Sequence, residues 1–216
     1  MKQSIFITGI GTDVGKTVVS AIVTEALQAD YWKPVQAGFA EGTDAERVRA
    51  LVSNPFTVVH DELYRLHTPA SPHIAARMDG IAIDERTILQ QAAALQQAAG
   101  DRPLVIEGAG GLLVPFSDTL FVADLVRSLQ ARLVIVSRNY LGSINHSLLT
   151  AAWCRAQQLD VAGWIFNDDY LSYEAEIVGW SGYPSLGSIP KLSGFDRGLI
   201  AAEAAKLSGT LQAVIA

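Results

Sequence analysis

The sequence has few of the residues that build disulfide-linked, metal-cluster or nucleic-acid-binding proteins. Its 216 residues include a single cysteine, Cys154, which excludes an internal disulfide and a cysteine-rich metal site. Only 18% of the residues are charged, and 22 acidic residues against 16 basic ones give a net charge of −6. Because a negative protein repels phosphate backbones, we expect no general binding of nucleic acid.

Long apolar runs are also missing. No apolar stretch approaches the roughly 20 residues of a membrane span, and only four residues precede the apolar run that starts at Ile5. We therefore expect no membrane anchor, no signal peptide and a cytoplasmic location. Half of the residues are hydrophobic, so the chain can bury a large core, and we expect one domain over residues 1–216, with Cys154 inside it.

Strand-like and helix-like patterns alternate along most of the chain. Apolar runs predict strands at Ile5–Thr8, Tyr31–Pro34, Leu104–Glu107, Leu133–Ser137, Val161–Phe166 and Leu186–Ile189. Apolar residues at helical spacing predict helices at 17–28, 44–53, 85–99, 121–130, 144–158, 172–180 and 197–207. This alternation indicates an α/β fold, a mostly parallel sheet with helices on both faces. In such folds ligands bind beyond the carboxyl ends of the strands, so the residues after each strand matter most.

The first strand is followed by a glycine-rich loop, Thr8-Gly9-Ile10-Gly11-Thr12-Asp13-Val14-Gly15-Lys16-Thr17. A preceding strand and a following helix are the context that a phosphate-binding loop requires. Backbone N–H groups would hold the phosphates, Lys16 would reach the terminal ones and the Thr17 hydroxyl would ligate Mg²⁺. Gly9 and Gly15 enclose one residue more than the usual spacing, so a chance Gly-Lys-Thr in a turn is the alternative. We expect a P-loop-type nucleoside triphosphate site.

Polar and charged side chains follow several of the predicted strands. Lys33 ends the second strand, Asp44 opens the next helix and Glu107 ends the third strand. Each has a simpler interpretation, namely a surface lysine, a helix N-terminal acid and a solvated strand-end acid. P-loop enzymes, however, place an acid that manages Mg²⁺ opposite the phosphate loop. Asn167, after the fifth strand, could read a base edge or form a turn. Ser143 is expected to cap the helix after the fourth strand.

Taken together, these segments resemble the dethiobiotin synthetase family. The resemblance runs from Phe6 to about Leu192. It rests on segments 8–17, 33–38, 43–44, 71–74, 107–111, 117–119, 123–124, 141–150, 163–168 and 187–190. Many nucleotide enzymes share the first of these, but its combination with Lys-Pro-Val-Gln-Ala-Gly and Glu-Gly-Ala-Gly-Gly is specific.

The resemblance implies an ATP- and Mg²⁺-dependent cyclo-ligase of biotin biosynthesis. Such an enzyme converts 7,8-diaminononanoate and CO₂ into dethiobiotin through a carbamate and a carbamic–phosphoric anhydride, and it releases ADP and phosphate. The resemblance also implies a sheet of about seven strands and a homodimer whose sites are shared across the interface.

Carried over residue by residue, the resemblance assigns roles along the chain. The catalytic residues would be Lys16, Lys33 and Glu107, and the Mg²⁺ ligands would be Thr17, Asp44 and Glu107. The nucleotide-binding residues would be Thr12, Asp13, Val14, Gly15, Lys16, Thr17, Val18, Asp44, Glu107, Gly108, Ala109, Gly110, Asn167, Asp168, Pro190, Lys191 and Leu192. The diamine would contact Lys33, Ala37, Gly110 and, from the partner subunit, Leu141, Gly142, Ser143 and Asn145.

Some features leave alternatives open. Ala37 stands where the family usually has Ser or Thr near the carbamate, so a hydrogen bond is lost and an altered paralogue is conceivable. A partitioning or metal-insertion switch ATPase of the same superfamily would carry a second lysine early in the loop, where this chain has Ile10 or Gly11. An amide-forming ligase would normally add a glutaminase domain with a nucleophilic cysteine, which Cys154 alone does not supply.

Overall fold

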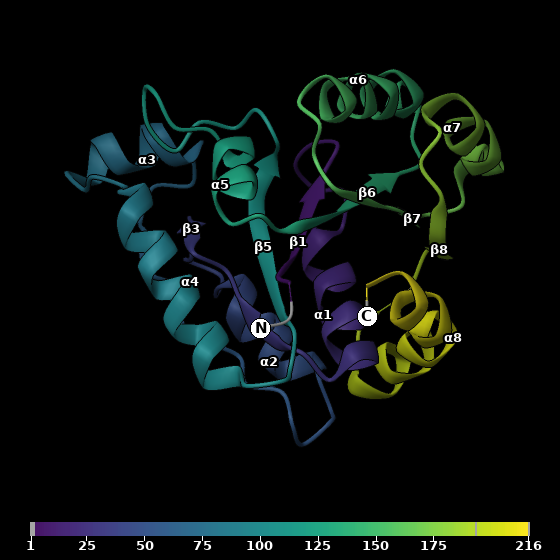
Figure 1. Cartoon of the computed structure of the whole chain (residues 1–216), viewed down its shortest axis with the longest axis horizontal. Helices are drawn as coiled ribbons and strands as arrows, with labels where there is room; N and C mark the ends of the chain where they lie inside the picture. The colour runs from purple at the N-terminus through teal and green to yellow at the C-terminus, as the bar shows by residue number, and fades with distance from the viewer. Residues whose placement is uncertain (1–2, 193, 216) are drawn as a thin grey trace.

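The computed structural model describes residues 3–192 and 194–215, and the first two residues of the short N-terminal segment considered above lie outside it. Helices and strands alternate along these residues (Figure 1). The strands are β1 (Ile5–Gly9), β2 (Asp30–Trp32), β3 (Val35–Ala37), β4 (Tyr64–Leu66), β5 (Leu104–Gly111), β6 (Arg132–Arg138), β7 (Val161–Asn167) and β8 (Ser185–Ile189). The helices are α1 (Lys16–Leu27), α2 (Asp44–Leu51), α3 (Pro72–Asp79), α4 (Glu85–Ala99), α5 (Val122–Ser128), α6 (Ser143–Ala156), α7 (Glu174–Ser181) and α8 (Arg197–Ile215), with a 3₁₀ turn at Tyr170–Ser172.

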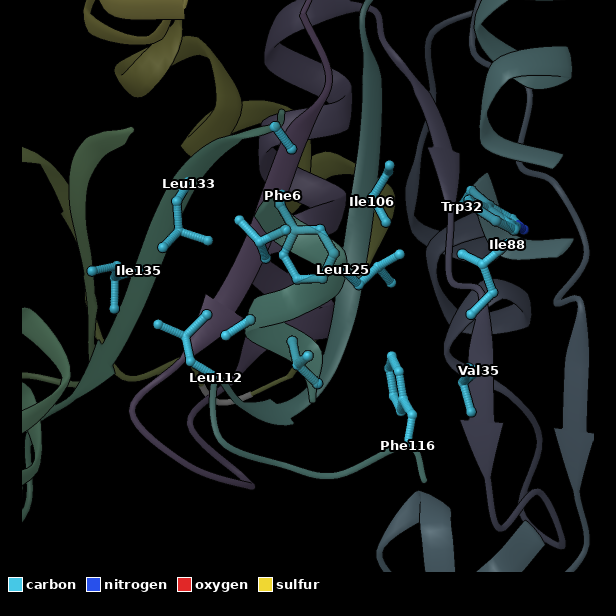
Figure 2. Close-up of a cluster of buried hydrophobic side chains, with 14 of the residues drawn as sticks. Phe6, Trp32, Val35, Ile88, Ile106, Leu112, Phe116, Leu125, Leu133 and Ile135 are labelled. Carbon is cyan, nitrogen blue, oxygen red and sulfur yellow. The ribbon is translucent and has the colours of Figure 1, made fainter. Parts of the chain in front are cut away.

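The main sheet has six strands in the order β2-β5-β1-β6-β7-β8, and all neighbouring pairs are parallel. Parallel neighbours need crossover connections, which place helices on both faces. Successive side chains of β1 accordingly enter two cores. Phe6 belongs to a buried cluster with residues of α4, α5 and α6, part of which Figure 2 shows, whereas Ile5 and Ile7 belong to a second cluster with residues of α1, α2 and α8. The α/β prediction is confirmed.

The six predicted strands all lie in this main sheet, but its size and one strand differ from expectation. The second predicted strand breaks at Lys33 and Pro34, because the chain leaves the main sheet there and continues as β3. Strand β3 pairs with β4 in a separate two-stranded parallel sheet. Within the described residues the main sheet therefore has six strands, not the seven that the family resemblance implied.

Strands β3 and β4 and helix α3 were not predicted, and one helix is longer than predicted. Strand β4 is only three residues long, too short to show an alternating pattern. Helix α3 begins with Pro72 after Ser71, which is a known start signal, but the segment was interpreted only as a family motif. Helix α8 continues past residue 207, where Leu207 and Leu211 are buried one turn apart. No helix within the described ranges is both long and apolar enough to cross a bilayer.

Candidate active site

The phosphate loop lies between β1 and α1, as predicted. Its glycines are needed for close approach as well as for backbone conformation. A Cβ on Gly9 would meet Val14 Cγ2 at 2.5 Å. Gly15 has φ 91°, and a Cβ there would meet Asn167 Nδ2 at 2.1 Å. The loop can therefore bring backbone N–H groups close to a ligand at the N-terminus of α1.

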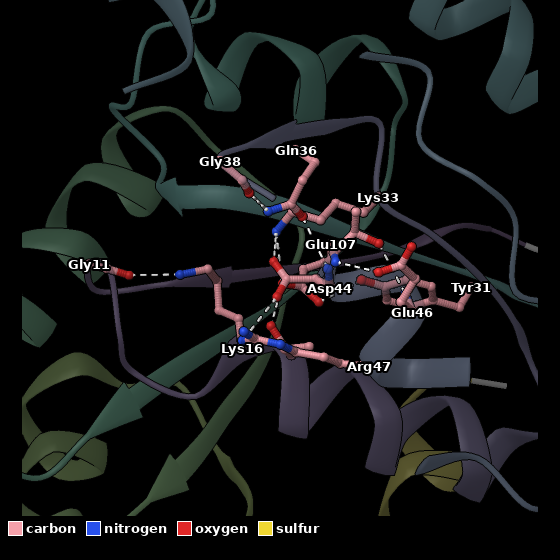
Figure 3. Close-up of polar contacts among 12 residues, drawn as sticks. Gly11, Lys16, Tyr31, Lys33, Gln36, Gly38, Asp44, Glu46, Arg47 and Glu107 are labelled. Carbon is pink, nitrogen blue, oxygen red and sulfur yellow. Dashed lines mark hydrogen bonds and ion pairs between the residues drawn. The ribbon is translucent and has the colours of Figure 1, made fainter. Parts of the chain in front are cut away.

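Lys16 is the first residue of α1 and is largely buried. Its ammonium donates a hydrogen bond to the carbonyl oxygen of Gly11 at 2.9 Å (Figure 3). Burial and then the neighbouring charge of Lys33 lower the pKa of Lys16 to about 8. A nearby anion favours the charged form of an amine, so a bound phosphate would raise this pKa again.

The centre of the site is a buried ion cluster around Lys33. Its ammonium lies 2.7 Å from Asp44 Oδ2 and 3.0 Å from Glu107 Oε1 (Figure 3). Only 5% of Lys33 and 1% of Glu107 are exposed, so the interpretations as a surface lysine and a solvated acid are wrong. Burial alone would lower the pKa of Lys33, but the two carboxylates outweigh it and raise that pKa. The two carboxylates thus favour the charged form of Lys33, in which its ammonium donates hydrogen bonds.

Glu107 has two further donors. The hydroxyl of Thr17 donates to Oε1 at 3.1 Å, and the hydroxyl of Tyr31 donates to Oε2 at 2.8 Å. Burial and then the charge of Glu107 raise the pKa of Tyr31 well above its usual value, so this hydroxyl remains a donor. Sequence reasoning missed Tyr31. The available signal was its position two residues before Lys33, because side chains two apart share a face of an extended chain.

Asp44 is both a helix N-terminal acid and a charged residue of the site, the two interpretations that the sequence suggested. It is the first residue of α2, whose N-cap is Thr43 in a capping box with Glu46. It also pairs with Lys33. Burial opposes ionisation of Asp44, but the charge and hydrogen bond of Lys33 outweigh it and lower the pKa of this carboxyl. Gln36 accepts a hydrogen bond from the Asp44 backbone at 3.2 Å and so ties the start of α2 to β3.

The oxygen atoms of Thr17, Asp44 and Glu107 fit a magnesium ion, since all are hard donors, two of them from carboxylates, and contacts with Lys33 and Thr17 gather them in one place. Within the described ranges no group of three or more His, Cys, Asp or Glu residues could hold a metal by itself. Magnesium in nucleotide enzymes usually takes one or two carboxylates and completes its shell with phosphates and water. The donor set therefore suits an ion that arrives with a nucleotide.

A cavity of about 770 Å³ opens over this cluster, a size that suits small-molecule ligands. Its charged lining residues are Asp13, Asp44, Glu107, Lys16, Lys33 and Arg47, so three acids face three bases. Its apolar wall includes Val35, Ala37, Pro69, Pro72 and Val114. A ligand bound here would meet both charged and apolar side chains.

Most residues predicted for the phosphates and the diamine amines line this cavity. They are Thr12, Asp13, Gly15, Lys16, Thr17, Val18, Lys33, Ala37, Asp44, Glu107, Ala109 and Gly110. Val14 and Gly108 do not line it, because Val14 is buried and a Cβ on Gly108 would meet Phe6 at 2.7 Å. Nine further lining residues were not among the predicted site residues, and they are Val35, Gln36, Arg47, Pro69, Ala70, Ser71, Pro72, Val114 and Phe195.

The residues predicted for the nucleotide base lie outside the cavity lining. The Asn167 amide donates to the carbonyl oxygen of Val14 at 3.0 Å, so it braces the phosphate loop. Asp168 lies 3.4 Å from Arg138 Nε. Pro190 and Lys191 are exposed and Leu192 is half-buried. A role for these residues in base binding stays a prediction.

The start of α6 also lies apart from the cavity lining. Leu141 is 89% exposed, and Gly142 and Asn145 are exposed as well. Gly142, with φ 103°, is the N-cap, so the prediction of Ser143 as the cap is wrong. Ser143 is instead the first helical residue, and its hydroxyl lies 2.6 Å from the hydroxyl of Tyr173. Glycine takes the cap because it adopts positive φ without steric cost.

Comparisons with known proteins identify both a sequence family and structures of similar fold. A protein family described as an AAA domain matches residues 3–197. The ATP-dependent dethiobiotin synthetase BioD of Christiangramia forsetii is 46% identical over 197 residues, which are 91% of each chain. The protein of the same name from Rhizorhabdus wittichii is 45% identical over 203 residues, 94% of each chain.

Solved structures show a likeness of fold alone. The MinD cell division protein of Aquifex aeolicus is 15% identical with a TM-score of 0.58, over 96% of this chain and 97% of that one. A plasmid partition protein from Borrelia burgdorferi is 14% identical with a TM-score of 0.58, over 99% of this chain and 100% of that one. Identities above 40% over most of the chain occur instead with the biosynthetic enzymes. The chain belongs to the family of ATP-dependent dethiobiotin synthetases.

Proposed function

We propose that this protein is a dethiobiotin synthetase, which joins 7,8-diaminononanoate and CO₂ at the expense of ATP and with the help of Mg²⁺. The observation that carries the proposal is the buried Lys33 ammonium held by Asp44 and Glu107 beside the phosphate loop. It places positive charge where a nucleotide and a second anion would meet. The apolar wall of the same cavity suits the hydrocarbon chain of the diamine.

The reaction has three chemical steps. One amine of the diamine adds to CO₂ and loses a proton, which gives a carbamate. A carbamate oxygen attacks the γ-phosphorus of ATP, and ADP leaves with the electrons of the broken P–O bond. The second amine then attacks the carbonyl carbon of the mixed anhydride, a urea ring closes and phosphate leaves. Phosphoryl transfer offers little covalent work to a protein, so positioning and charge must supply catalysis.

The side chains divide this work by charge. Lys16 would neutralise the β- and γ-phosphates, and Lys33, fixed in its charged form, would donate to the carbamate and the γ-phosphate oxygens. Thr17, Asp44 and Glu107 would hold Mg²⁺, which supplies further positive charge to the phosphates when bound. Ala37 offers no hydroxyl to the carbamate, so the backbone and Lys33 would have to position it.

We propose further that the enzyme is a homodimer with shared sites, and that each chain acts as one domain. The cavity of one chain is lined by Lys33 and the loop, whereas the start of α6 is absent from its lining and is exposed. A linear substrate with amines at Lys33 needs a separate place for its distant carboxylate. The N–H groups at the start of α6 in a second chain would supply it. The expected cytoplasmic location stays a prediction.

The decisive experiment is a product assay. The purified protein is incubated with ATP, Mg²⁺, ¹³C-bicarbonate and the diamine, and dethiobiotin is sought by mass spectrometry. A product one mass unit heavier than with ordinary bicarbonate, formed together with one ADP per ring, would establish the activity. Hydrolysis of ATP without this product would contradict the proposal.

A further inference from the structure

Arg47 lines the cavity and has no role in the proposed function as derived so far. It lies on α2 three residues after Asp44, so both side chains share the face of the helix that borders the site. Figure 3 shows the side chain of Arg47 extending toward the Asp44 carboxylate. The guanidinium Nη1 lies 3.9 Å from Asp44 Oδ1, which is beyond hydrogen-bonding distance.

The other two cations of the cavity are already engaged by the protein. The Lys33 ammonium is held by two carboxylates at 2.7 and 3.0 Å. The Lys16 ammonium donates to a backbone carbonyl at 2.9 Å. Among the described residues that line the cavity, Arg47 is thus the basic side chain without a partner at hydrogen-bonding distance, and its five N–H donors are available to a ligand.

The balance of charge in the cavity indicates that a bound triphosphate would need a further positively charged donor. Its acidic and basic side chains are equal in number, so the protein alone offers no surplus of positive charge. A magnesium-bound triphosphate still carries about two negative charges, which are spread over the γ-phosphate oxygens during transfer. Backbone N–H groups of a phosphate loop cradle the α- and β-phosphates, which would leave the γ-phosphate to side chains that line the cavity, such as Arg47 on α2. Guanidinium is well suited to bind two oxygens of one phosphate at once.

From this geometry we infer that Arg47 binds the γ-phosphate of ATP from α2, as a further catalytic residue, and so makes the site prefer ATP over ADP. The inference rests on the proposed function. When the substrate is bound, the guanidinium moves from its long contact with Asp44 to the phosphate. Asp44 then keeps its short contact with Lys33, so no buried charge loses its partner.

The test compares two nucleotides in Arg47→Gln. Dissociation constants are measured by calorimetry in Mg²⁺ for ADP and for the β,γ-imido analogue of ATP. We expect the analogue to bind about tenfold more weakly than to the wild type, as for the loss of one charged hydrogen-bonding partner. ADP should bind as before within about twofold. With the diamine and bicarbonate present, kcat should fall while the KM for the diamine stays constant.

Two further variants keep the result interpretable. Arg47→Lys preserves the charge and should retain part of the preference for the triphosphate. Arg49→Gln is the matched control, because Arg49 lies on the same helix but binds Asp61 and the Val59 carbonyl oxygen away from the cavity. Its two dissociation constants should not change.

Equal losses for both nucleotides, or no loss for either, would overturn the inference even if the wild type makes dethiobiotin. A change only in the KM for the diamine would also overturn it, since Arg47 would then serve the second substrate. If instead the wild type binds ATP but makes no dethiobiotin, the proposed function fails while the nucleotide comparison still decides the role of Arg47.

Discussion

The two ends of the proposed substrate path are built in opposite ways. At the phosphate end, Lys33, Glu107 and Tyr31 are at most 5% exposed, and contacts of 2.8 and 3.0 Å hold them together. At the start of α6, Leu141 is 89% exposed, and a Cβ added to Gly142 would meet no atom within 4 Å.

The difference matches the chemistry proposed for each end. Charge that changes during a reaction is best stabilised by groups fixed beforehand, because no energy is then spent on reorganising them. A carboxylate that takes no part in bond making needs only a few N–H donors, which a second chain can bring. The comparison teaches that a substrate-binding site that is incomplete in one chain can be completed by a second chain.

The largest effect is expected at the buried end, from Lys16→Ala. No other side chain of the loop carries positive charge, so the terminal phosphates lose their closest cation. We expect kcat/KM for ATP to fall by about 10²–10³ or more. Lys206→Ala, which removes a lysine paired with Glu203 on α8, is the control and should leave the rate unchanged. Activity within about threefold of wild type in Lys16→Ala would refute the phosphate-loop assignment.

The proposed sharing of sites through the exposed start of α6 is tested by mixing two inactive variants. Lys33→Ala removes the cation at the amines, and the double variant Gly142→Ala, Asn145→Ala disrupts the start of α6. If sites are shared, each heterodimer has one intact site, so an equal mixture should recover about a quarter of wild-type activity. Mass spectrometry of the intact complex confirms that heterodimers form. Heterodimers without activity, or a monomer with full activity, would rule out shared sites.

A smaller effect is expected for Tyr31→Phe, which removes one hydroxyl from the buried cluster. Glu107 Oε2 then loses its donor, which costs about 1–3 kcal/mol in a buried site. We expect a loss of that size in the free energy of unfolding, and a higher Mg²⁺ concentration for half-maximal rate. Tyr64→Phe is the control, because the Tyr64 hydroxyl accepts one bond at an exposed position. Equal Mg²⁺ requirements in Tyr31→Phe and wild type would show that Tyr31 is only a core residue.

The smallest effect is expected for Ala37→Ser, which restores the hydroxyl that the family usually carries beside the carbamate. Ala37 lines the cavity, so the added oxygen would face the ligand. One hydrogen bond of about 0.5–1.5 kcal/mol should lower the KM for the diamine by up to about tenfold or leave it unchanged. Steady-state kinetics decide between outcomes. A large fall in kcat/KM would mean that the pocket is shaped around alanine.

The residues at the phosphate end could be predicted better from the sequence than the contacts at the start of α6, and the reason is physical. Lys16, Lys33, Asp44 and Glu107 follow strands, and a parallel sheet brings all strand ends to one edge, so their meeting was predictable. Tyr31 and Arg47 were missed because their roles depend on which residues face them across the fold. The predicted strand Tyr31–Pro34 ran past Trp32, where β2 ends, and β3 was missed, since three residues are too few for a pattern that shows where a chain changes sheets. In the proposed dimer a second chain would contact the exposed start of α6, and the sequence of one chain does not show where that contact lies.

The equal numbers of acids and bases in the cavity have a consequence for how fast the nucleotide arrives. The protein as a whole carries a charge of −6, and its cavity adds no compensating positive field. ATP is therefore not drawn in over distances beyond about 10 Å, the range of screened charges in ordinary buffer. Attraction by the site would then begin only at short range, where Lys16 exchanges the Gly11 carbonyl oxygen for a phosphate and the Arg47 guanidinium, which has no partner at hydrogen-bonding distance, meets one. A preference for the triphosphate would thus be exercised after collision and not before it.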